Sequence, residues 1–202
     1  YIHGELQLAV LRACLIKGHL ERASDIFSEI TAKVIMEFKK KNEVVPSRLL
    51  GYMTKGHLDV IGFCTDYSTA RTFFDAAIRG QLPYPIPLQM EAVKRFMLNT
   101  YSATRSLEKV EDIWISSWKF YQSHSWSNSS MSSTLNNTFM EIFFDKHDTF
   151  NEQAALDLQH SLSLYNEVKP FDEPLFNCLL IQSMVWKIKP FFKSVIQASN
   201  MY

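Results

Sequence analysis

Three stretches of the sequence align with one another without gaps: GHLERASDIF (18–27), TDYSTARTFF (65–74) and RSLEKVEDIW (105–114). In each stretch a smaller side chain is followed four residues later by a large aromatic one: Ala23 and Phe27, Ala70 and Phe74, Val110 and Trp114. A spacing of four residues places both side chains on one face of a helix. The smaller side chain lets a neighbouring helix approach, and the larger one fills a groove, so the alignment predicts stacked helix pairs.

Helical periodicity extends this pattern over the rest of the chain. A fourth copy fits residues 150–158 with Ala154 in the small position, so the intervals are 47, 40 and 44 residues. The first forty residues predict a hairpin that turns at Gly18 and continues to Phe38. Further helices are expected at 66–80, 88–101, 107–118, 135–144, 152–164, 175–187 and from Pro190 onward, with a loop over the Ser-rich residues 123–133.

We therefore expect an all-α fold, an α-solenoid of about four to five antiparallel helix pairs that form one helical-repeat domain over residues 1–202. The uneven interval leaves an irregular helical bundle as the alternative. The chain begins with Tyr1 rather than Met, so we expect a fragment of a longer protein. Only 6 Gly and 7 Pro occur in 202 residues, which argues against the many tight turns of an all-β fold.

Composition and motifs also restrict the function. Lys and Arg (21) balance Asp and Glu (21), so a nucleic-acid partner would have to be met by a local basic face. The three cysteines form no CxxC pair, the six histidines show no metal-ligand spacing, and no apolar run is long enough to span a membrane. We expect no metal, no cofactor and no enzymatic activity.

Two strings resemble pentatricopeptide repeats: LRACLIKGHLERASDIFSEI (11–30) and EVKPFDEPLFNCLLIQSM (167–184). The first has the Lys-Gly turn of that family, followed by Leu-Glu-x-Ala and a closing Phe. The second has its Lys-Pro-(x)-Asp signature, followed by a helix that opens with an aromatic residue, Asn and two aliphatic residues. Long, degenerate, Phe- and Ser-rich repeats are similar to those of fungal mitochondrial members, such as the mRNA-stabilising domain of an ATPase-synthesis protein.

The resemblance implies a non-catalytic module in the mitochondrial matrix that stabilises an organellar mRNA or supports its translation. Its implied partner is single-stranded RNA, with the mitochondrial ribosome or other expression factors as further candidates. In regular members, polar residues at two positions of each repeat read one base. Asn137 and Asn177 fit the early position and Asp172 the repeat-end position, while the equivalent early positions in other repeats are Leu8, Lys55 and Arg95. Leu8 has no polar group with which to read a base.

Basic and aromatic side chains supply the remaining candidates for RNA contact. Lys94, Arg95 and Arg105 are expected to line one repeat and to bind phosphates, as is Lys55 in the repeat before it. The residues that could stack on bases are Tyr52, Tyr101, Trp126 and Tyr165, whereas Trp114, Trp118, Phe73 and Phe74 are expected in the core.

Two alternatives stay open. Asp172 could cap the helix that begins near Pro174 instead of reading a base. The chain as a whole could be a scaffold of the tetratricopeptide type that holds a peptide or helix of a protein partner. The neutral charge favours the scaffold, and the Lys-Pro-(x)-Asp and Asn pattern favours RNA.

Overall fold

The computed structural model describes residues 2–124, 129–147 and 151–168, and these residues form helices and connecting turns with no strand. The all-α prediction is therefore confirmed. The chain divides into two compact units, Tyr1–Thr104 and Arg105–Tyr202. None of the described helices is both long enough and apolar enough to cross a bilayer.

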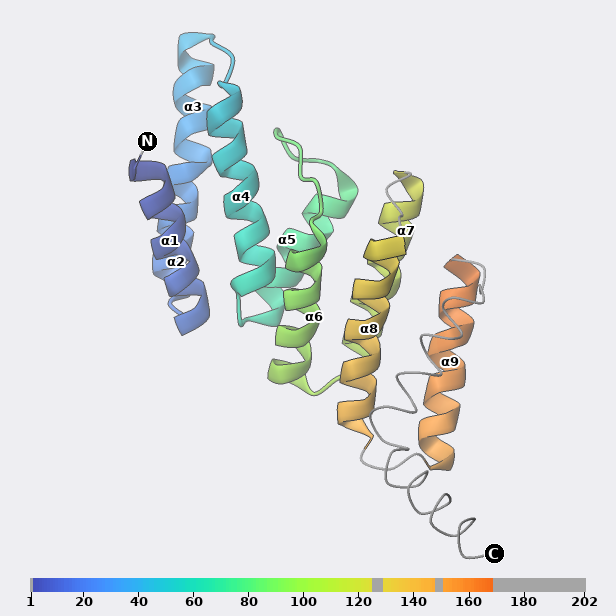
Figure 1. The fold of residues 1–202 in the computed structure, drawn as a ribbon. Helices are drawn as coiled ribbons and strands as arrows, with labels where there is room; N and C mark the ends of the chain where they lie inside the picture. Colours follow the sequence, from blue (N-terminus) through green and yellow to red (C-terminus); the bar gives the residue numbers. More distant parts are fainter. Residues whose placement is uncertain (1, 125–128, 148–150, 169–202) are drawn as a thin grey trace, which may run out of the picture. The chain divides into compact units, whose positions relative to one another are not determined.

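The first unit contains six helices among its described residues (Figure 1): α1 (Ile2–Lys17), α2 (Leu20–Ile30), α3 (Ala32–Lys41), α4 (Ser47–Phe63), α5 (Tyr67–Arg79) and α6 (Met90–Thr104). Helix α4 packs against α1 on one side and α6 on the other, so α1, α4 and α6 form one layer. Helices α2 and α5 pack on α1 and α4 respectively and belong to a second layer.

Local sequence signals explain several of the helix ends. Helix α1 stops at Gly18, which adopts a φ of +74° that an L side chain would resist. The carboxylate of Asp66 caps α5 by accepting a hydrogen bond from the Thr69 backbone N–H at 2.8 Å. Gly80, with a φ of +63°, ends the same helix.

The second helix of the first hairpin is not continuous as predicted. It breaks at Thr31, whose hydroxyl donates a hydrogen bond to the Phe27 carbonyl oxygen at 2.8 Å. The backbone of Thr31 (φ −115°, ψ −77°) deviates from regular helical angles, and α2 and α3 are separate helices on either side of it. None of the helix ranges predicted from the sequence corresponds to α4. The alignment of the repeats had nevertheless placed Lys55, which lies on α4, early in the first helix of a repeat.

The predicted small and large pairs lie largely in the core. Ala23, Ala70 and Val110 are buried, as are Phe74 and Trp114. Phe27 is the exception: it is half-buried and packs edge-on against Phe73 with ring centroids 5.0 Å apart.

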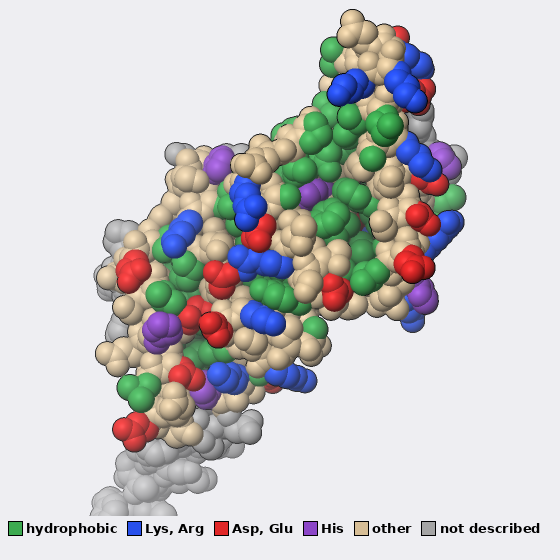
Figure 2. All heavy atoms as spheres, turned by 180° about the vertical axis from the view of Figure 1, so that it is seen from behind, with side chains coloured by type: hydrophobic (Ala, Val, Ile, Leu, Met, Phe, Trp, Pro, Cys, Tyr) green, Lys and Arg blue, Asp and Glu red, His purple; other side chains and the backbone are tan. Residues whose placement is uncertain are grey.

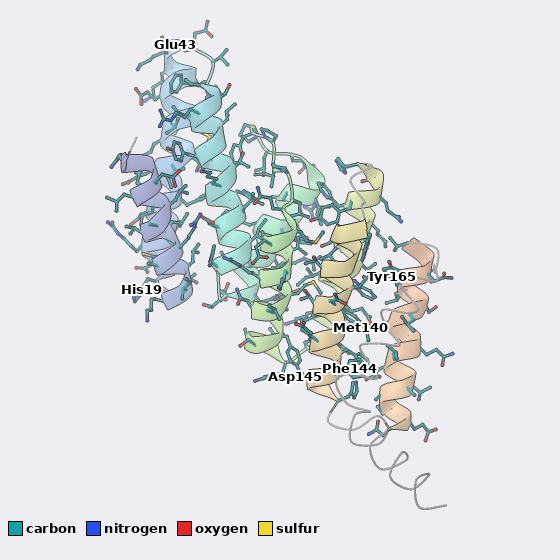
Figure 3. The ribbon with its side chains drawn as sticks, viewed as in Figure 1. His19, Glu43, Met140, Phe144, Asp145 and Tyr165 are labelled. Carbon is teal, nitrogen blue, oxygen red and sulfur yellow. The ribbon has the colours of Figure 1, made fainter. Side chains whose placement is uncertain are left out.

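The second unit contains three helices among its described residues: α7 (Leu107–Ser123), α8 (Ser129–Lys146) and α9 (Glu152–Val168). Both α8 and α9 pack on α7. Tyr165 lies on the side of α9 that faces the other two helices (Figure 3), and its ring stacks on Trp114 at 5.1 Å. The loop predicted for 123–133 is wrong in its last part, because α8 already begins at Ser129. The helices predicted from residue 175 onward lie outside the described residues.

Candidate nucleic-acid interface

Two of the predicted RNA-binding residues lie on the layer formed by α1, α4 and α6. Lys55 on α4 pairs with Glu5 on α1, with Nζ and Oε1 3.1 Å apart. Arg95 on α6 donates from Nε to Glu91 Oε1 at 3.0 Å, and its guanidinium carbon lies 4.4 Å from the centre of the Phe63 ring. The repeat register therefore identified two basic side chains of the same unit and the same helix layer.

A buried carboxylate lies between these basic residues. Asp59 on α4 has a side chain that is only 9% exposed, and its Oδ2 accepts a hydrogen bond from Arg12 Nε at 2.8 Å. Burial raises the pKa of Asp59 above its ordinary value, while Arg12, through its hydrogen bond and its charge, and then the charges of Arg95 and Lys55, oppose that shift. Arg12, Asp59 and Arg95 line the same cleft, and Lys55 lies one helical turn before Asp59 on α4.

A cleft of about 230 Å³ opens between the three helices. The residues that give it its chemistry are Arg12, Asp59, Phe63, Gln89, Glu91 and Arg95. Phe63 is half-buried, and the guanidinium groups of Arg12 and Arg95 lie 5.6 and 4.4 Å from its ring centre. The cleft thus combines an aromatic surface with guanidinium planes and carboxylate acceptors, which are the groups that proteins use to hold unpaired bases.

Arg12, Asp59 and Asn99 were not among the predicted site residues, although the sequence contained a signal for them. They are separated by 47 and 40 residues, the same intervals that relate Ala23, Ala70 and Val110. Arg12 binds Asp59, and Asn99 Nδ2 donates to the Gly62 carbonyl oxygen at 3.0 Å, so this row links α1 to α4 and α4 to α6. Asp59 and Asn99 each lie four residues, or one helical turn, after the predicted residues Lys55 and Arg95, so the same repeat alignment relates them.

The other predicted basic and amide residues are more scattered. Lys94 on α6 is half-buried and takes part in none of the ion pairs of the described residues. Arg105 begins the second unit with a φ of +54°, and its Nη1 lies 3.8 Å from Asp145 Oδ2. Asn137 is half-buried on α8 of that unit. Asp172 and Asn177 lie outside the described residues, so their roles stay predictions.

Two of the four aromatic residues predicted to stack on bases are buried in the structure. Tyr101 and Tyr165 are buried, with 9% and 0% exposure, so the prediction that they stack on bases is wrong. Tyr52 is half-buried on α4, with the Lys55 ammonium 5.7 Å from its ring centre. Trp126 lies outside the described residues. The predicted core residues Trp114, Trp118 and Phe74 are buried, whereas Phe73 is half-buried.

The other layer of the first unit has a different character. Figure 2, which views the molecule from the side opposite to Figure 1, shows hydrophobic side chains gathered openly over this part of the chain. A cleft of about 240 Å³ is lined there by α2 and α5 with one residue each from α1 and α4, and none of its lining residues is charged. Of these two clefts, the one in the α1, α4 and α6 layer is lined by charged side chains and the other is not.

In the part of the chain that the structure describes, no group of three His, Cys, Asp or Glu side chains could hold a metal ion.

The fold and the cleft together define an all-helical protein with paired helices and a mixed basic, acidic and aromatic face on one helix layer. The sequence matches the RMD9 middle domain family over residues 1–202, and the chain belongs to this family.

Similar proteins agree with this assignment. The chain is 32% identical over 202 residues to a Saccharomyces cerevisiae protein named "RNA-binding protein RMD9-like, mitochondrial", of which it covers 26%. It is 32% identical over 186 residues to that organism's "RNA-binding protein RMD9, mitochondrial", of which it covers 27%. The solved structure of yeast Rmd9p in complex with a 16-nucleotide target RNA matches the whole chain with a TM-score of 0.76 and 29% identity, and the match covers 37% of that structure's chain. The chain therefore spans about a quarter of the length of these relatives.

Proposed function

We propose that this chain is a non-catalytic RNA-binding module that stabilises a mitochondrial mRNA or supports its translation. Single-stranded RNA would lie along the α1, α4 and α6 layer of the first unit. The observation that carries the proposal is the cleft that Arg12, Asp59 and Arg95 line together, beside the half-buried ring of Phe63. The RNA-bound structure of the yeast relative supports it, as do the names of the relatives.

The chemistry of this face suits a flexible single strand better than a duplex. Each of the three cations is already paired with a carboxylate of the protein: Glu5, Asp59 or Glu91. Phosphates would compete for exposed pairs such as Lys55 with Glu5, which are weak in water. Stacking on Phe63 and on guanidinium planes would then supply the part of the affinity that a neutral protein surface cannot supply by charge.

The repeat architecture belongs to the same proposal. The helix pairs would be degenerate pentatricopeptide-type repeats, stacked as a right-handed solenoid of four to five pairs in one domain. Its support is the register of 47 and 40 residues, which relates Arg12, Asp59 and Asn99 as well as the small core residues. The mitochondrial matrix is the proposed location, since the relatives are named mitochondrial, and the mitochondrial ribosome and other expression factors remain proposed partners.

The apolar cleft between α2 and α5 favours a second candidate function, a scaffold that holds a helix or peptide of a protein partner. This function would use the layer opposite to the proposed RNA face, so the two functions can be tested separately by variants on each layer.

Fluorescence anisotropy of a labelled single-stranded RNA pool, titrated with the chain at two salt concentrations, tests the proposal. Binding should weaken as salt rises, and Lys55→Met should reduce the slope of log affinity against log salt by about 0.7, the share of one phosphate contact on a single strand. Arg95→Glu should weaken binding strongly. Arg22→Glu makes the same charge change on the exposed surface of α2 and should leave binding nearly unchanged. Absence of binding at low salt, with the chain folded by circular dichroism, would refute the proposal.

A further inference from the structure

The cleft between α1, α4 and α6 carries carboxylates as well as guanidinium groups. Arg12 and Arg95 contribute two positive charges, and Asp59 and Glu91 contribute two negative ones. A phosphate group on its own would be attracted by the guanidinium groups and repelled by the carboxylates. The ligand that suits this cleft therefore carries a hydrogen-bond donor close to its negative charge.

Asp59 offers the acceptor for such a donor. Its side chain is 9% exposed, and Oδ2 accepts a hydrogen bond from Arg12 Nε at 2.8 Å. The other oxygen, Oδ1, accepts no hydrogen bond from a described residue, and it is not enclosed by protein. An ionised carboxylate can only accept hydrogen bonds, and a nearly buried one that lacks a donor is costly. A ligand in the cleft that donates to Oδ1 would therefore be bound more strongly than at a solvated carboxylate.

Arg12 offers the matching cation. Its Nε donates to Asp59, and its Nη groups donate to no described residue. The Arg12 side chain is 44% exposed, so these groups can reach a ligand that comes from the solvent. Together the two residues present free N–H donors beside one free carboxylate oxygen.

A ribonucleotide carries the complementary pair of groups. Its 2′-hydroxyl is a donor on the carbon next to the one that bears the 3′-phosphate, so the phosphate can accept from Arg12 while the hydroxyl donates to Asp59. Deoxyribose has only hydrogen at this position and would leave Oδ1 without a donor. The 2′-hydroxyl is the group by which a protein can tell RNA from DNA. Since sugar and phosphate repeat in every nucleotide, this contact requires no particular base.

We propose that the pair of Arg12 and Asp59 reads the ribose-phosphate backbone and selects RNA over single-stranded DNA. This inference rests on the proposed function, since it names the part of the strand that the same cleft would hold. Asp59 determines the selectivity through the 2′-hydroxyl. Arg12 binds the adjacent phosphate, and its Nε bond fixes the orientation of the carboxylate. Glu5 and Glu91 also pair with cations, but they are 58% and 63% exposed, so water satisfies them and they select weakly.

Fluorescence anisotropy with three labelled pools of the same random sequence and length tests this assignment. The pools are RNA, its 2′-deoxy form with uracil retained, and its 2′-fluoro form, so that only the sugar differs. The 2′-fluoro sugar keeps the pucker of ribose but has no donor. The wild-type chain should bind the RNA pool about tenfold more tightly than either modified pool, the share of one hydrogen bond to a charged group.

Variants assign the effect to the proposed pair. Asp59→Ala removes the acceptor and should bind the three pools alike. The double variant Arg12→Met with Asp59→Leu leaves no unpaired charge and should also bind them alike, which covers the case in which Asp59→Ala does not fold. Glu5→Ala is the matched control: it removes one negative charge from the same helix layer outside the cleft, and it should keep the tenfold preference.

Three results would each overturn the assignment. They are equal binding of the RNA and 2′-deoxy pools by the wild type, a 2′-fluoro pool that binds as tightly as RNA, and a preference for RNA that persists in the folded Asp59 variants. Failure of all three pools to bind the wild-type chain would instead refute the proposed function.

Discussion

Asn136 joins three aromatic residues inside the second unit, and its replacement should be costly. Its side chain is 3% exposed, and its Oδ1 accepts hydrogen bonds from the indole N–H groups of Trp114 at 2.9 Å and Trp118 at 3.2 Å. Its Nδ2 donates to the Tyr165 hydroxyl at 3.3 Å. Asn136→Leu keeps a similar volume but leaves two buried indole donors without an acceptor. Each such donor costs about 1–3 kcal/mol, so the free energy of unfolding should fall by about 2–6 kcal/mol.

Urea unfolding followed by tryptophan fluorescence is the appropriate assay, because all four tryptophans of the chain lie in the second unit. A loss of this size is a large fraction of the ~5–15 kcal/mol that holds a typical domain together. Gln159→Leu is the matched control in the same unit: this side chain is exposed on α9, so a smaller loss is expected. An Asn136→Leu chain that unfolds at the same urea concentration as the wild type would refute the reasoning.

Two further predictions concern the first unit. A Cβ atom on Gly62 would lie 3.3 Å from the Ala92 backbone, so Gly62→Val should force α4 and α6 apart and lower the free energy of unfolding in urea by about 1–3 kcal/mol. A Cβ atom on Gly51 would meet open space, so Gly51→Ala should raise that free energy by about 0.5–1 kcal/mol. Burial lowers the pKa of His57, so its neutral form is retained on folding and the unfolded chain takes up the proton first. The free energy of unfolding should therefore decrease as pH falls below ~6.5 towards the lowered folded pKa, and His57→Gln should reduce that slope.

The helical content of the chain could be predicted because periodicity and glycine stops are local signals. Gly18 and Gly80 end helices where expected, since their positive φ angles are a property of the residue itself. The break at Thr31 was not predictable in this way, because a Thr hydroxyl bonded four residues back occurs within helices as well as at their ends. Likewise, the Ser-rich start of α8 resembles a loop in composition.

The candidate site was predicted in part, for a related reason. Lys55 and Arg95 were found because the repeat register places equivalent residues on one helix layer. Asp59 was missed because a single acidic residue on a helix resembles a solvated one, and its burial depends on packing with neighbouring helices. Tyr101 and Tyr165 were misassigned because their burial depends on neighbouring helices and not on their own helical pattern.

The measurement that tests the central claim most directly is photochemical crosslinking of single-stranded RNA carrying 4-thiouridine or 6-thioguanosine, with the crosslinked peptides identified by mass spectrometry. RNA that lies along the α1, α4 and α6 layer should crosslink to peptides of α4 and α6, including the one that contains Phe63, and Arg95→Glu should reduce those crosslinks. Crosslinks confined to α2 and α5, around the apolar cleft, would contradict the account and place the RNA on the opposite layer.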